Sequence, residues 1–310
     1  MATQATKTPV KRKYLNPQEL RPFKNLLFAA RVIVEGAYSG RHQSPFKGAS
    51  QEFTEYREYN PGDELRLIDW KAYGRTDRYI VKLFEKETDM NCYLLVDASA
   101  SMAFGGKGYE QHFGKGDLSK FDYAATLAAA LAYLTIRQGD RVGLTLFDTK
   151  VRSHHVAGAT FTHLYTLLNS LESCKPGQPT AISQTLREAF CLFRRRGLLI
   201  VLSDFLDDPE EIFQSLGLYT HRGFDVLLLQ IFHRYEYELP SLPSVKFIDA
   251  ETGQKLVSKP DEIRDNYHRE IGAFIEQIGG RARARRIDYE FVNTQTPYQH
   301  VLQRFLQKRS

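Results

Sequence analysis

Side chains with oxygen donors gather at three places in the sequence, each a predicted loop at the end of a buried strand or the start of a helix. Two are aspartates and three are serine or threonine residues, so the group offers carboxylate and hydroxyl oxygens. These hard donors suit Mg²⁺, Mn²⁺ or Ca²⁺ better than zinc or copper. We therefore predict one divalent-metal site, and its residues are Asp97, Ser99, Ser101, Thr180 and Asp204.

Two predicted strands and one loop must position these residues. Residues 92–96 and 198–202 are short apolar runs, typical of strands buried on both faces of a sheet, and an aspartate follows each run closely. Between them, residues 175–180 form a loop rich in proline and glycine that leads into a predicted helix. In open α/β sheets, ligands bind beyond the carboxyl ends of the strands, so we expect the three segments to meet at one edge.

Each of these residues, taken alone, has a structural alternative. An aspartate after a strand is often a helix N-cap, and a serine hydroxyl caps helices in the same way. All five residues nevertheless lie in loops that the predicted fold brings to one edge of the sheet. This joint placement favours a metal site over independent caps.

Strands and helices alternate along the sequence from residue 90 onward. Predicted strands cover residues 92–96, 142–147, 151–156, 198–202, 226–232 and 288–292. Predicted helices cover residues 120–137, 160–173, 181–196, 208–219, 261–279 and 298–307. The alternation predicts an α/β fold with a doubly wound, mostly parallel six-stranded sheet of the Rossmann-like kind, and we expect a small β insertion at about residues 240–258.

The chain divides into three predicted parts. Residues 1–14 form a flexible basic tail, residues 15–89 an N-terminal helical and β extension packed on the core, and residues 90–310 the α/β domain. The first 48 residues hold nine lysine and arginine residues against two glutamates. Such an arm binds nucleic acid, an acidic membrane or an acidic protein, but no aromatic and basic interleaving accompanies it, which favours a solvated tail.

The N-terminal extension combines predicted secondary structure with a dense set of charges. We expect one or two helices in residues 16–38, a proline–glycine turn at residues 60–63 and a strand at residues 79–84. Trp70, the only tryptophan, is expected to bury its ring. The charged residues form either an internal ion-pair network or a partner-docking surface. They are Arg57, Asp63, Arg66, Asp69, Arg75, Asp77 and Arg78.

The order of the predicted ligands resembles a known motif. Asp97-x-Ser99-x-Ser101, a loop threonine at Thr180 and then Asp204 after a buried strand are similar to the metal-ion-dependent adhesion site of von Willebrand factor A domains. All five positions match in order. The resemblance implies a von Willebrand factor A-like fold and a metal bound by these five residues, with the hydroxyls as direct ligands.

The N-terminal extension narrows this resemblance to one family. Four short segments, at residues 57–63, 66–70, 75–78 and 81–85, look like the signature of the "domain of unknown function 58" proteins, and the resemblance covers about residues 15–310. It implies frequent pairing with MoxR-type AAA+ ATPases in chaperone-like systems. It implies no enzymatic activity.

The predicted ligands also suggest what the metal does. Neutral hydroxyl ligands leave a divalent cation poorly neutralised, and Mg²⁺ commonly keeps water-filled positions. A partner that supplies an aspartate or glutamate would complete the coordination. We therefore predict a non-enzymatic, metal-dependent protein–protein interaction module, and the resemblance makes it an adaptor or co-chaperone of a MoxR-type AAA+ ATPase.

Two other functions remain as alternatives. A metal-dependent phosphoesterase with an aspartyl nucleophile usually has a second acid two residues later, where this chain has Ser99, and no lysine or histidine is evident beside the motif. Nucleic-acid binding through the basic N-terminal arm is the other alternative, which the missing aromatic and basic pattern disfavours.

Cysteine usage and hydropathy predict the compartment. The three cysteines are odd in number and form no CxxC pair, as expected for inert thiols in a reducing environment. No apolar stretch reaches the ~18 residues that a membrane span requires. We therefore expect a cytoplasmic protein without a membrane span.

Overall fold

The computed structural model describes residues 12–20, 51–58, 69–86, 90–105, 118–239, 242–250 and 253–307. The chain forms two compact units, one of residues 1–34 with 90–310 and the other of residues 35–89. Each unit is described by itself. The predicted packing of residues 15–89 on the core stays a prediction.

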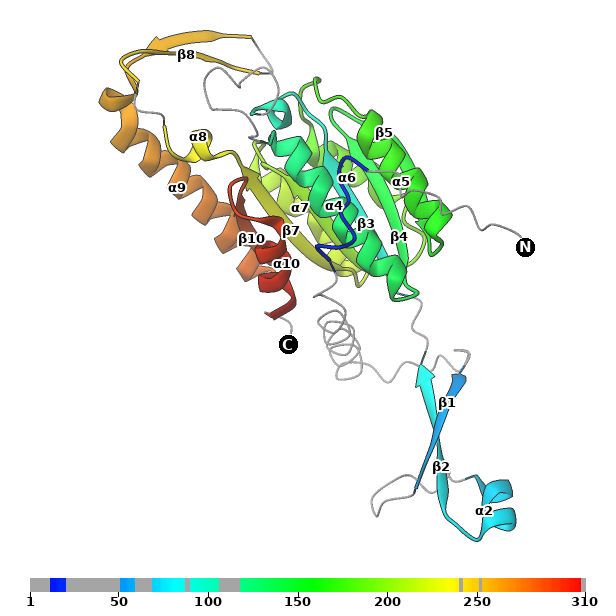
Figure 1. Ribbon diagram of the computed structural model, residues 1–310. Coiled ribbons are helices and arrows are strands. Elements are labelled where there is room, and N and C mark those ends of the chain that lie inside the picture. The colour runs from blue at the N-terminus through cyan, green and yellow to red at the C-terminus, as the bar shows by residue number, and fades with distance from the viewer. Residues whose placement is uncertain are drawn as a thin grey trace, which may run out of the picture. The chain divides into compact units, whose positions relative to one another are not determined.

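A six-stranded sheet forms the centre of the larger unit (Figure 1). Its strands are β3 (Asn91–Asp97), β4 (Arg141–Phe147), β5 (Val151–Gly158), β6 (Leu198–Ser203), β7 (Asp225–Phe232) and β10 (Asp288–Asn293). They lie in the order β10-β7-β6-β3-β4-β5, and every neighbouring pair is parallel except β4 and β5. The predicted α/β fold with a mostly parallel six-stranded sheet is therefore confirmed.

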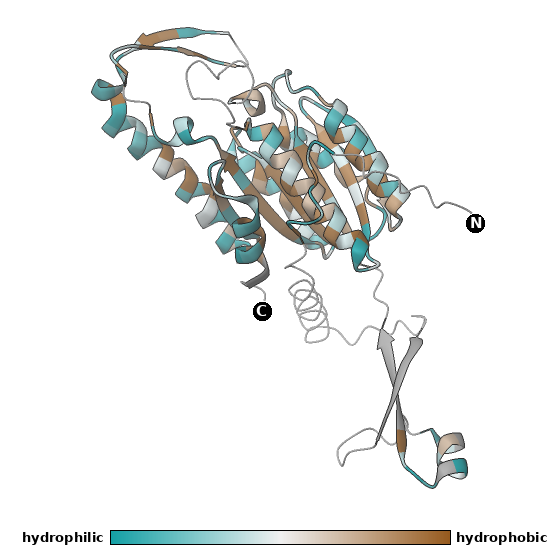
Figure 2. Cartoon of the chain, viewed as in Figure 1, coloured by the Kyte–Doolittle hydropathy of each residue, from teal (hydrophilic) through white to brown (hydrophobic). Residues whose placement is uncertain are grey.

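Helices cover both faces of this sheet. Alternate residues of β3 enter two separate apolar clusters, because successive side chains of a strand point to opposite faces. One cluster includes α4 (Lys120–Arg137), α5 (Phe161–Ser173) and α10 (Tyr298–Gln307). The other includes α6 (Ile182–Phe190), α7 (Pro209–His221) and α9 (Pro260–Ala284). Figure 2 shows the apolar residues concentrated in the strands between these layers.

Two helices differ from the predicted bounds for reasons of packing. α6 ends at Phe190 instead of residue 196, because Phe193 turns inward and stacks on Tyr93 with ring centroids 4.4 Å apart. α9 continues through Gly279 to Ala284, beyond the predicted end at residue 279. At Gly279 the ring of Tyr289 lies so close that a Cβ would meet it at 3.0 Å, so the glycine serves helix–strand packing.

The helix α4 has the bounds predicted for it. Ser119 caps it by accepting the N–H of Asp122 at 3.0 Å, and alanines fill its interior. Residues 12–20 lie against the same part of the unit: Tyr14 is buried, and its hydroxyl donates to the Asp122 carboxylate at 2.6 Å. The end of the predicted flexible tail thus makes defined contacts, whereas residues 1–11 lie outside the described part.

An insertion follows β7. It contains the short helix α8 (Arg234–Tyr237) and an antiparallel hairpin of β8 (Val245–Ile248) and β9 (Lys255–Ser258). The hairpin, but not α8, lies within residues 240–258, where a β insertion is predicted. Ile248, Leu256 and Val257 are exposed apolar residues on this hairpin. No helix in the described part of the chain is long and apolar enough to cross a membrane.

The smaller unit is a hairpin with one helix. β1 (Gln51–Glu58) pairs antiparallel with β2 (Ile80–Lys86), and α2 (Trp70–Thr76) lies between them in sequence. The prediction that Trp70 buries its ring is wrong: the side chain is 60% exposed and meets the edge of Tyr73. Trp70 is the first residue of α2, and its side chain does not anchor the segment by burial as predicted. Of residues 16–38, where one or two helices were expected, residues 17–20 form a turn and residues 21–38 lie outside the described residues, as does the turn predicted at residues 60–63.

Candidate functional site

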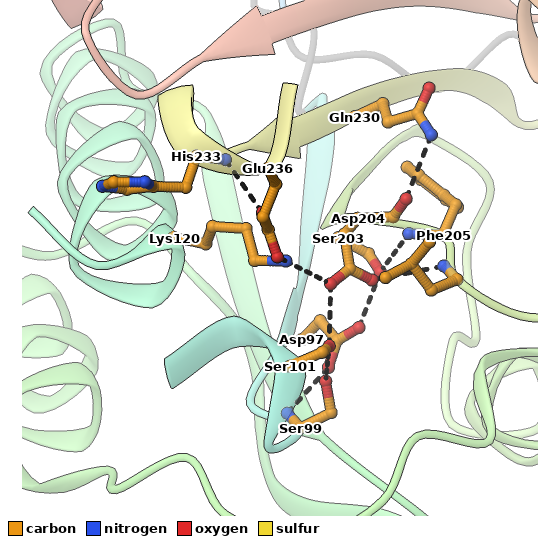
Figure 3. A network of polar contacts seen from close by, with 11 residues as sticks. Asp97, Ser99, Ser101, Lys120, Ser203, Asp204, Phe205, Gln230, His233 and Glu236 are labelled. Carbon is orange, nitrogen blue, oxygen red and sulfur yellow. Dashed lines mark hydrogen bonds and ion pairs between the residues drawn. The ribbon is translucent and has the colours of Figure 1, made fainter. Parts of the chain in front are cut away.

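The candidate site lies where two neighbouring strands end. β3 ends at Asp97 and β6 ends at Ser203, and the two strands are parallel neighbours in the sheet. From β3 the chain continues into a short 3-10 helix, η3 (Ser101–Ala103), and from β6 it continues into Asp204. The fold thereby brings predicted ligands from two loops to one place (Figure 3).

Hydrogen bonds hold both oxygens of Asp97. Its Oδ1 accepts the backbone N–H of Ser99 at 2.8 Å, and its Oδ2 accepts the hydroxyl of Ser203 at 2.6 Å. The Ser203 Oγ accepts the N–H of Phe205 at 2.9 Å. Because Asp97 is completely buried, these bonds replace the water that its carboxylate loses on folding.

A second chain of contacts joins the remaining ligands of these two loops. The hydroxyls of Ser99 and Ser101 lie 3.1 Å apart, and the Ser101 hydroxyl donates to Asp204 Oδ2 at 2.7 Å. Ser99 and Asp204 are completely buried, whereas Ser101 is half-buried. The structure therefore brings Asp97, Ser99, Ser101 and Asp204 into one group, with Ser101 on its more accessible side.

The turn after β6 fixes Asp204 in place. Its Oδ1 accepts the N–H of Leu206 at 3.2 Å, and its backbone carbonyl accepts the side-chain amide of Gln230 at 3.0 Å. The next residue, Phe205, has a φ of 59° and a buried ring, a left-handed conformation that is unfavourable for a residue with a Cβ. Backbone strain of this kind is found at functional sites, where the surrounding structure maintains it.

The loop that carries Thr180 is joined to the same edge. Ser99 and Gln178 form an isolated parallel β-bridge, in which the Ala100 N–H donates to the Gln178 carbonyl at 2.6 Å. Thr180 itself is half-buried and stands two residues before the start of α6. All three predicted loops therefore meet at this edge, with the Thr180 loop anchored beside Ser99.

A lysine beside the group was missed by the sequence analysis. The Nζ of Lys120, the first residue of α4, lies 2.8 Å from Asp204 Oδ2 and 2.7 Å from Glu236 Oε1. Its side chain is completely buried. The expectation that no lysine stands beside the motif is therefore wrong, because a helix start distant in sequence delivers one.

Glu236 holds the lysine from the side of the insertion. It belongs to α8, where its Oε2 accepts the backbone N–H of His233 at 3.0 Å as part of a capping box. The Glu236 backbone carbonyl also accepts the Tyr267 hydroxyl from α9. Ring packing of His233 on Phe104, with centroids 5.2 Å apart, brings α8 against the loop after η3.

Sequence signals for these additional residues exist but are weak. Gln230 is the one polar residue in an otherwise apolar predicted strand, and Lys120 opens a helix where an acidic residue is usually favoured. Each is a departure from a local pattern, which is expected at functional positions. Glu236 has no comparable signal, because an acid in the first turn of a helix is ordinary.

Burial and neighbouring charges together determine the ionisation of the site. Burial and the negative charge of Asp204, partly opposed by the bonds from Ser203 and Ser99, together raise the pKa of Asp97 to about 7. Burial alone would lower the pKa of Lys120, but Asp204 and Glu236 outweigh it and raise the pKa. The lysine is therefore a protonated ammonium at neutral pH, and not a general base.

The donors present are of the kind that a hard divalent cation prefers. Asp97 and Asp204 would supply carboxylate oxygens and Ser99, Ser101 and Thr180 would supply hydroxyls. In the part of the chain that the structure describes, no three His, Cys, Asp or Glu side chains gather as a metal-binding group. A cation at this edge would therefore rely on the hydroxyls as well as on the two carboxylates.

The charged N-terminal residues proposed as a docking surface are described only in part. Asp63 and Arg66 lie outside the described residues, and the side chain of Arg57 is likewise outside them. Asp69 is buried and its Oδ1 accepts the N–H of Ala72 at 3.2 Å, which stabilises the start of α2. Arg75 and Arg78 are exposed. The docking role of this segment stays a prediction.

Comparison with solved structures finds proteins of low similarity. One is a conserved hypothetical protein BatB from Bacteroides thetaiotaomicron, 16% identical, with 71% of this chain and 98% of that chain covered and a TM-score of 0.45. Another is an aerotolerance-related membrane protein from Bacteroides fragilis, also 16% identical, with 71% and 99% covered and a TM-score of 0.44.

Relatives and a family model are more informative. Uncharacterized proteins Rv1480 of Mycobacterium tuberculosis and Mb1516 of Mycobacterium bovis are 27% identical over 263 residues, which is 83% of this chain and 79% of theirs. The model described as "Protein of unknown function DUF58" matches residues 55–273. This match covers most of the chain and spans the predicted ligands in all three loops. The chain therefore belongs to the DUF58 family.

Proposed function

We propose that this chain is a non-enzymatic module that binds a partner protein through a divalent cation, with Mg²⁺ the favoured ion. The observation that carries the proposal is the joined group of Asp97, Ser99, Ser101 and Asp204 at the carboxyl ends of β3 and β6. Its order along the chain resembles the metal-ion-dependent adhesion site of von Willebrand factor A domains. When bound, the cation would supply an open coordination position for a carboxylate of the partner.

The charges of the group support this proposal. Asp97, Asp204 and Glu236 bring three carboxylates to the site, and Lys120 brings one ammonium. With all four ionised, two negative charges remain, which a divalent cation would neutralise. Buried charges without compensation are costly, and the raised pKa of Asp97 reflects that cost.

The accessible side of the group indicates how a partner would approach. Asp97, Ser99 and Asp204 are completely buried, whereas Ser101 and Thr180 are half-buried. Because the Thr180 Oγ1 is itself buried, a partner's aspartate or glutamate would reach the cation from the side of Ser101. The identity of the partner as a MoxR-type AAA+ ATPase and the adaptor or co-chaperone role rest on the family resemblance alone. The expected cytoplasmic location rests on the cysteine usage and hydropathy of the sequence.

A metal-dependent phosphoesterase remains the alternative, and Lys120 is the observation that bears on it. A lysine near an aspartyl nucleophile could stabilise a phosphoryl group. Here the ammonium already contacts two carboxylates, at 2.8 and 2.7 Å. The position two residues after Asp97, where such an enzyme would have a second acid, is occupied by Ser99. These contacts favour a binding role for the group.

Calorimetry with Mg²⁺ and with Mn²⁺ tests the cation site. We expect one site in the wild type, none in Asp97→Ala, and unchanged binding in Asp208→Asn. Asp208 is an exposed carboxylate in the loop after Asp204, and asparagine preserves its capping of α7. Equal binding by the wild type and Asp97→Ala would refute the assignment of the ligands.

A pull-down with a MoxR-type ATPase tests the partnership. We expect the complex to form with Mg²⁺, to dissociate in chelator and to be lost in Ser101→Ala at the same cation concentration. A complex that persists in chelator would contradict the cation bridge. Hydrolysis of simple phosphoesters by the wild type, lost in Asp97→Ala, would instead favour the enzyme.

A further inference from the structure

The buried lysine departs from the local rules of helix structure. Lys120 is the first residue of α4, where the helix dipole disfavours a positive charge, and its side chain has no exposed surface. A solitary buried ammonium would be strongly unfavourable. Its position is therefore maintained by the two carboxylates that contact it, and it needs an explanation beyond the stability of α4.

The contact of the lysine with the site is direct. Asp204 Oδ2 accepts both the Lys120 ammonium at 2.8 Å and the Ser101 hydroxyl at 2.7 Å. The same oxygen therefore belongs to the lysine pair and to the candidate ligand group. A divalent cation held by Asp204 would lie close to the positive charge of Lys120 and would be repelled by it.

The contact on the other side of the lysine opposes this repulsion. Glu236 Oε1 lies 2.7 Å from the ammonium, and the Glu236 side chain is only 19% exposed. Its second oxygen accepts the His233 N–H, so α8 fixes the carboxylate in place. Glu236 thus provides a fixed negative charge on the side of the ammonium that α8 supplies.

We propose that Lys120 and Glu236 are positioning residues that set the cation affinity of the site: Lys120 weakens binding, and Glu236 offsets that weakening. The inference rests on the proposed cation site and deepens it. The pair keeps the affinity moderate, so that cation and partner carboxylate bind together and separate again. Because Glu236 belongs to α8, a displacement of α8 would change the affinity without moving a ligand.

The test compares Mg²⁺ dissociation constants of four full-length proteins by calorimetry at one pH and one ionic strength. Lys120→Met removes the positive charge and keeps the length of the side chain, so we expect Mg²⁺ to bind at least roughly tenfold more tightly. Glu236→Gln keeps the shape and removes the negative charge, so binding should weaken by a similar factor. The double variant should lie between the two, near the wild type.

Matched measurements separate this role from a structural one. Lys13→Met removes another lysine that pairs with α4, through Asp122 at 2.8 Å, and should leave the Mg²⁺ affinity unchanged. Circular dichroism and thermal unfolding in chelator establish that each variant folds. If Lys120→Met does not fold, Glu236→Gln still decides the question by its direction.

The outcomes distinguish this inference from the proposed function. If the wild type binds Mg²⁺ and a folded Lys120→Met binds it equally or more weakly, the inference is overturned and the cation site stands. Unchanged or tighter binding by Glu236→Gln overturns it as well. If neither the wild type nor Lys120→Met binds Mg²⁺ or Mn²⁺, both the site and the inference are wrong.

Discussion

Two charged residues in the first turn of α4 form their ion pairs in opposite environments. Lys120 is completely buried and contacts Asp204 and Glu236, whereas Asp122 contacts Lys13, whose side chain is 57% exposed. Asp122 obeys the local preference for an acid near a helix start, and Lys120 violates it. One helix turn thus carries an ordinary surface pair and a buried pair that belongs to the candidate site.

The difference in burial determines how much a single charged side chain contributes to the free energy of unfolding. An exposed ion pair contributes about 0.2–1 kcal/mol, because water already solvates both partners. Removing one partner of a buried pair costs about 3–5 kcal/mol, because the other charge stays buried without compensation. The comparison can be tested by removing, one at a time, a carboxylate of the buried site and the carboxylate of Asp122.

The largest loss of stability at neutral pH is expected from Asp204→Ala. Lys120 would lose one of its two carboxylates, and the Ser101 hydroxyl would lose its acceptor. We expect the free energy of unfolding to fall by about 3 kcal/mol in chelator, measured by urea denaturation at neutral pH. Mg²⁺ binding should also disappear. A loss no larger than that of Asp122→Ala would remove the distinction between the two pairs.

A large effect that depends on pH is expected from Asp97→Asn. The pKa of Asp97 is raised by burial from about 4 in the unfolded chain to about 7. The folded state therefore binds the proton more tightly, and in chelator the free energy of unfolding falls as pH rises from about 4 to about 7, by up to about 4 kcal/mol.

The asparagine variant should lose this dependence. Urea denaturation between pH 4 and pH 8, with chelator, should show a smaller downward slope for Asp97→Asn than for the wild type. Parallel slopes in the two proteins would mean that Asp97 ionises freely, and that its burial does not control the charge of the site.

Much of this arrangement could be predicted from the sequence, because short local patterns mark the strands, the helix caps and the loops that follow the strands. Apolar runs such as residues 92–96 and 198–202 report strands buried on both faces, and ligands follow such strands in a parallel sheet. Those rules found both aspartates and the loop of Thr180. They also found α4 to the residue, because a serine cap and an alanine-rich interior mark its bounds.

The remaining features depend on tertiary contacts that no local pattern encodes. Lys120 meets Asp204 across 84 residues and Glu236 across 116. The early end of α6 follows from the inward turn of Phe193, and the continuation of α9 through Gly279 follows from its packing on Tyr289. The prediction that Trp70 is buried was wrong because residue type alone does not determine burial: a large apolar side chain can stay exposed.

An intermediate effect is expected from Ser101→Ala. The substitution removes the hydroxyl that donates to Asp204 at 2.7 Å, while Lys120 still compensates the carboxylate. We expect a loss of about 1 kcal/mol in the free energy of unfolding, together with weaker Mg²⁺ binding by calorimetry. A Mg²⁺ affinity equal to that of the wild type would exclude Ser101 from the ligands.

The smallest effect is expected from Asp122→Asn. Burial would raise the pKa of Asp122, but the bonds from Lys13, Tyr14 and Ser119 outweigh it and lower the pKa. The carboxylate therefore stabilises the fold above the unfolded pKa of about 4, and this contribution is lost as pH falls through the lower folded value.

Because Lys13 is largely exposed, that contribution should be no more than about 1 kcal/mol at neutral pH. Urea denaturation from pH 7 to pH 2.5 should show the wild type and Asp122→Asn converging at the acidic end. The slope that Asp122 produces has the opposite sign to that of Asp97, so a shared sign would show that burial and not pairing controls both.

The β-bridge between Ser99 and Gln178 orders the Thr180 loop during folding, before any ligand binds. Two main-chain bonds, from Ala100 to Gln178 at 2.6 Å and from Gly177 to Ala98 at 3.3 Å, tie the loop to the sheet edge. The conformational-entropy cost of ordering the loop is therefore part of the free energy of folding. It does not reduce the free energy of ligand binding. The amide hydrogens of Ala100 and Gly177 should accordingly exchange slowly with deuterium, and to the same extent with or without Mg²⁺.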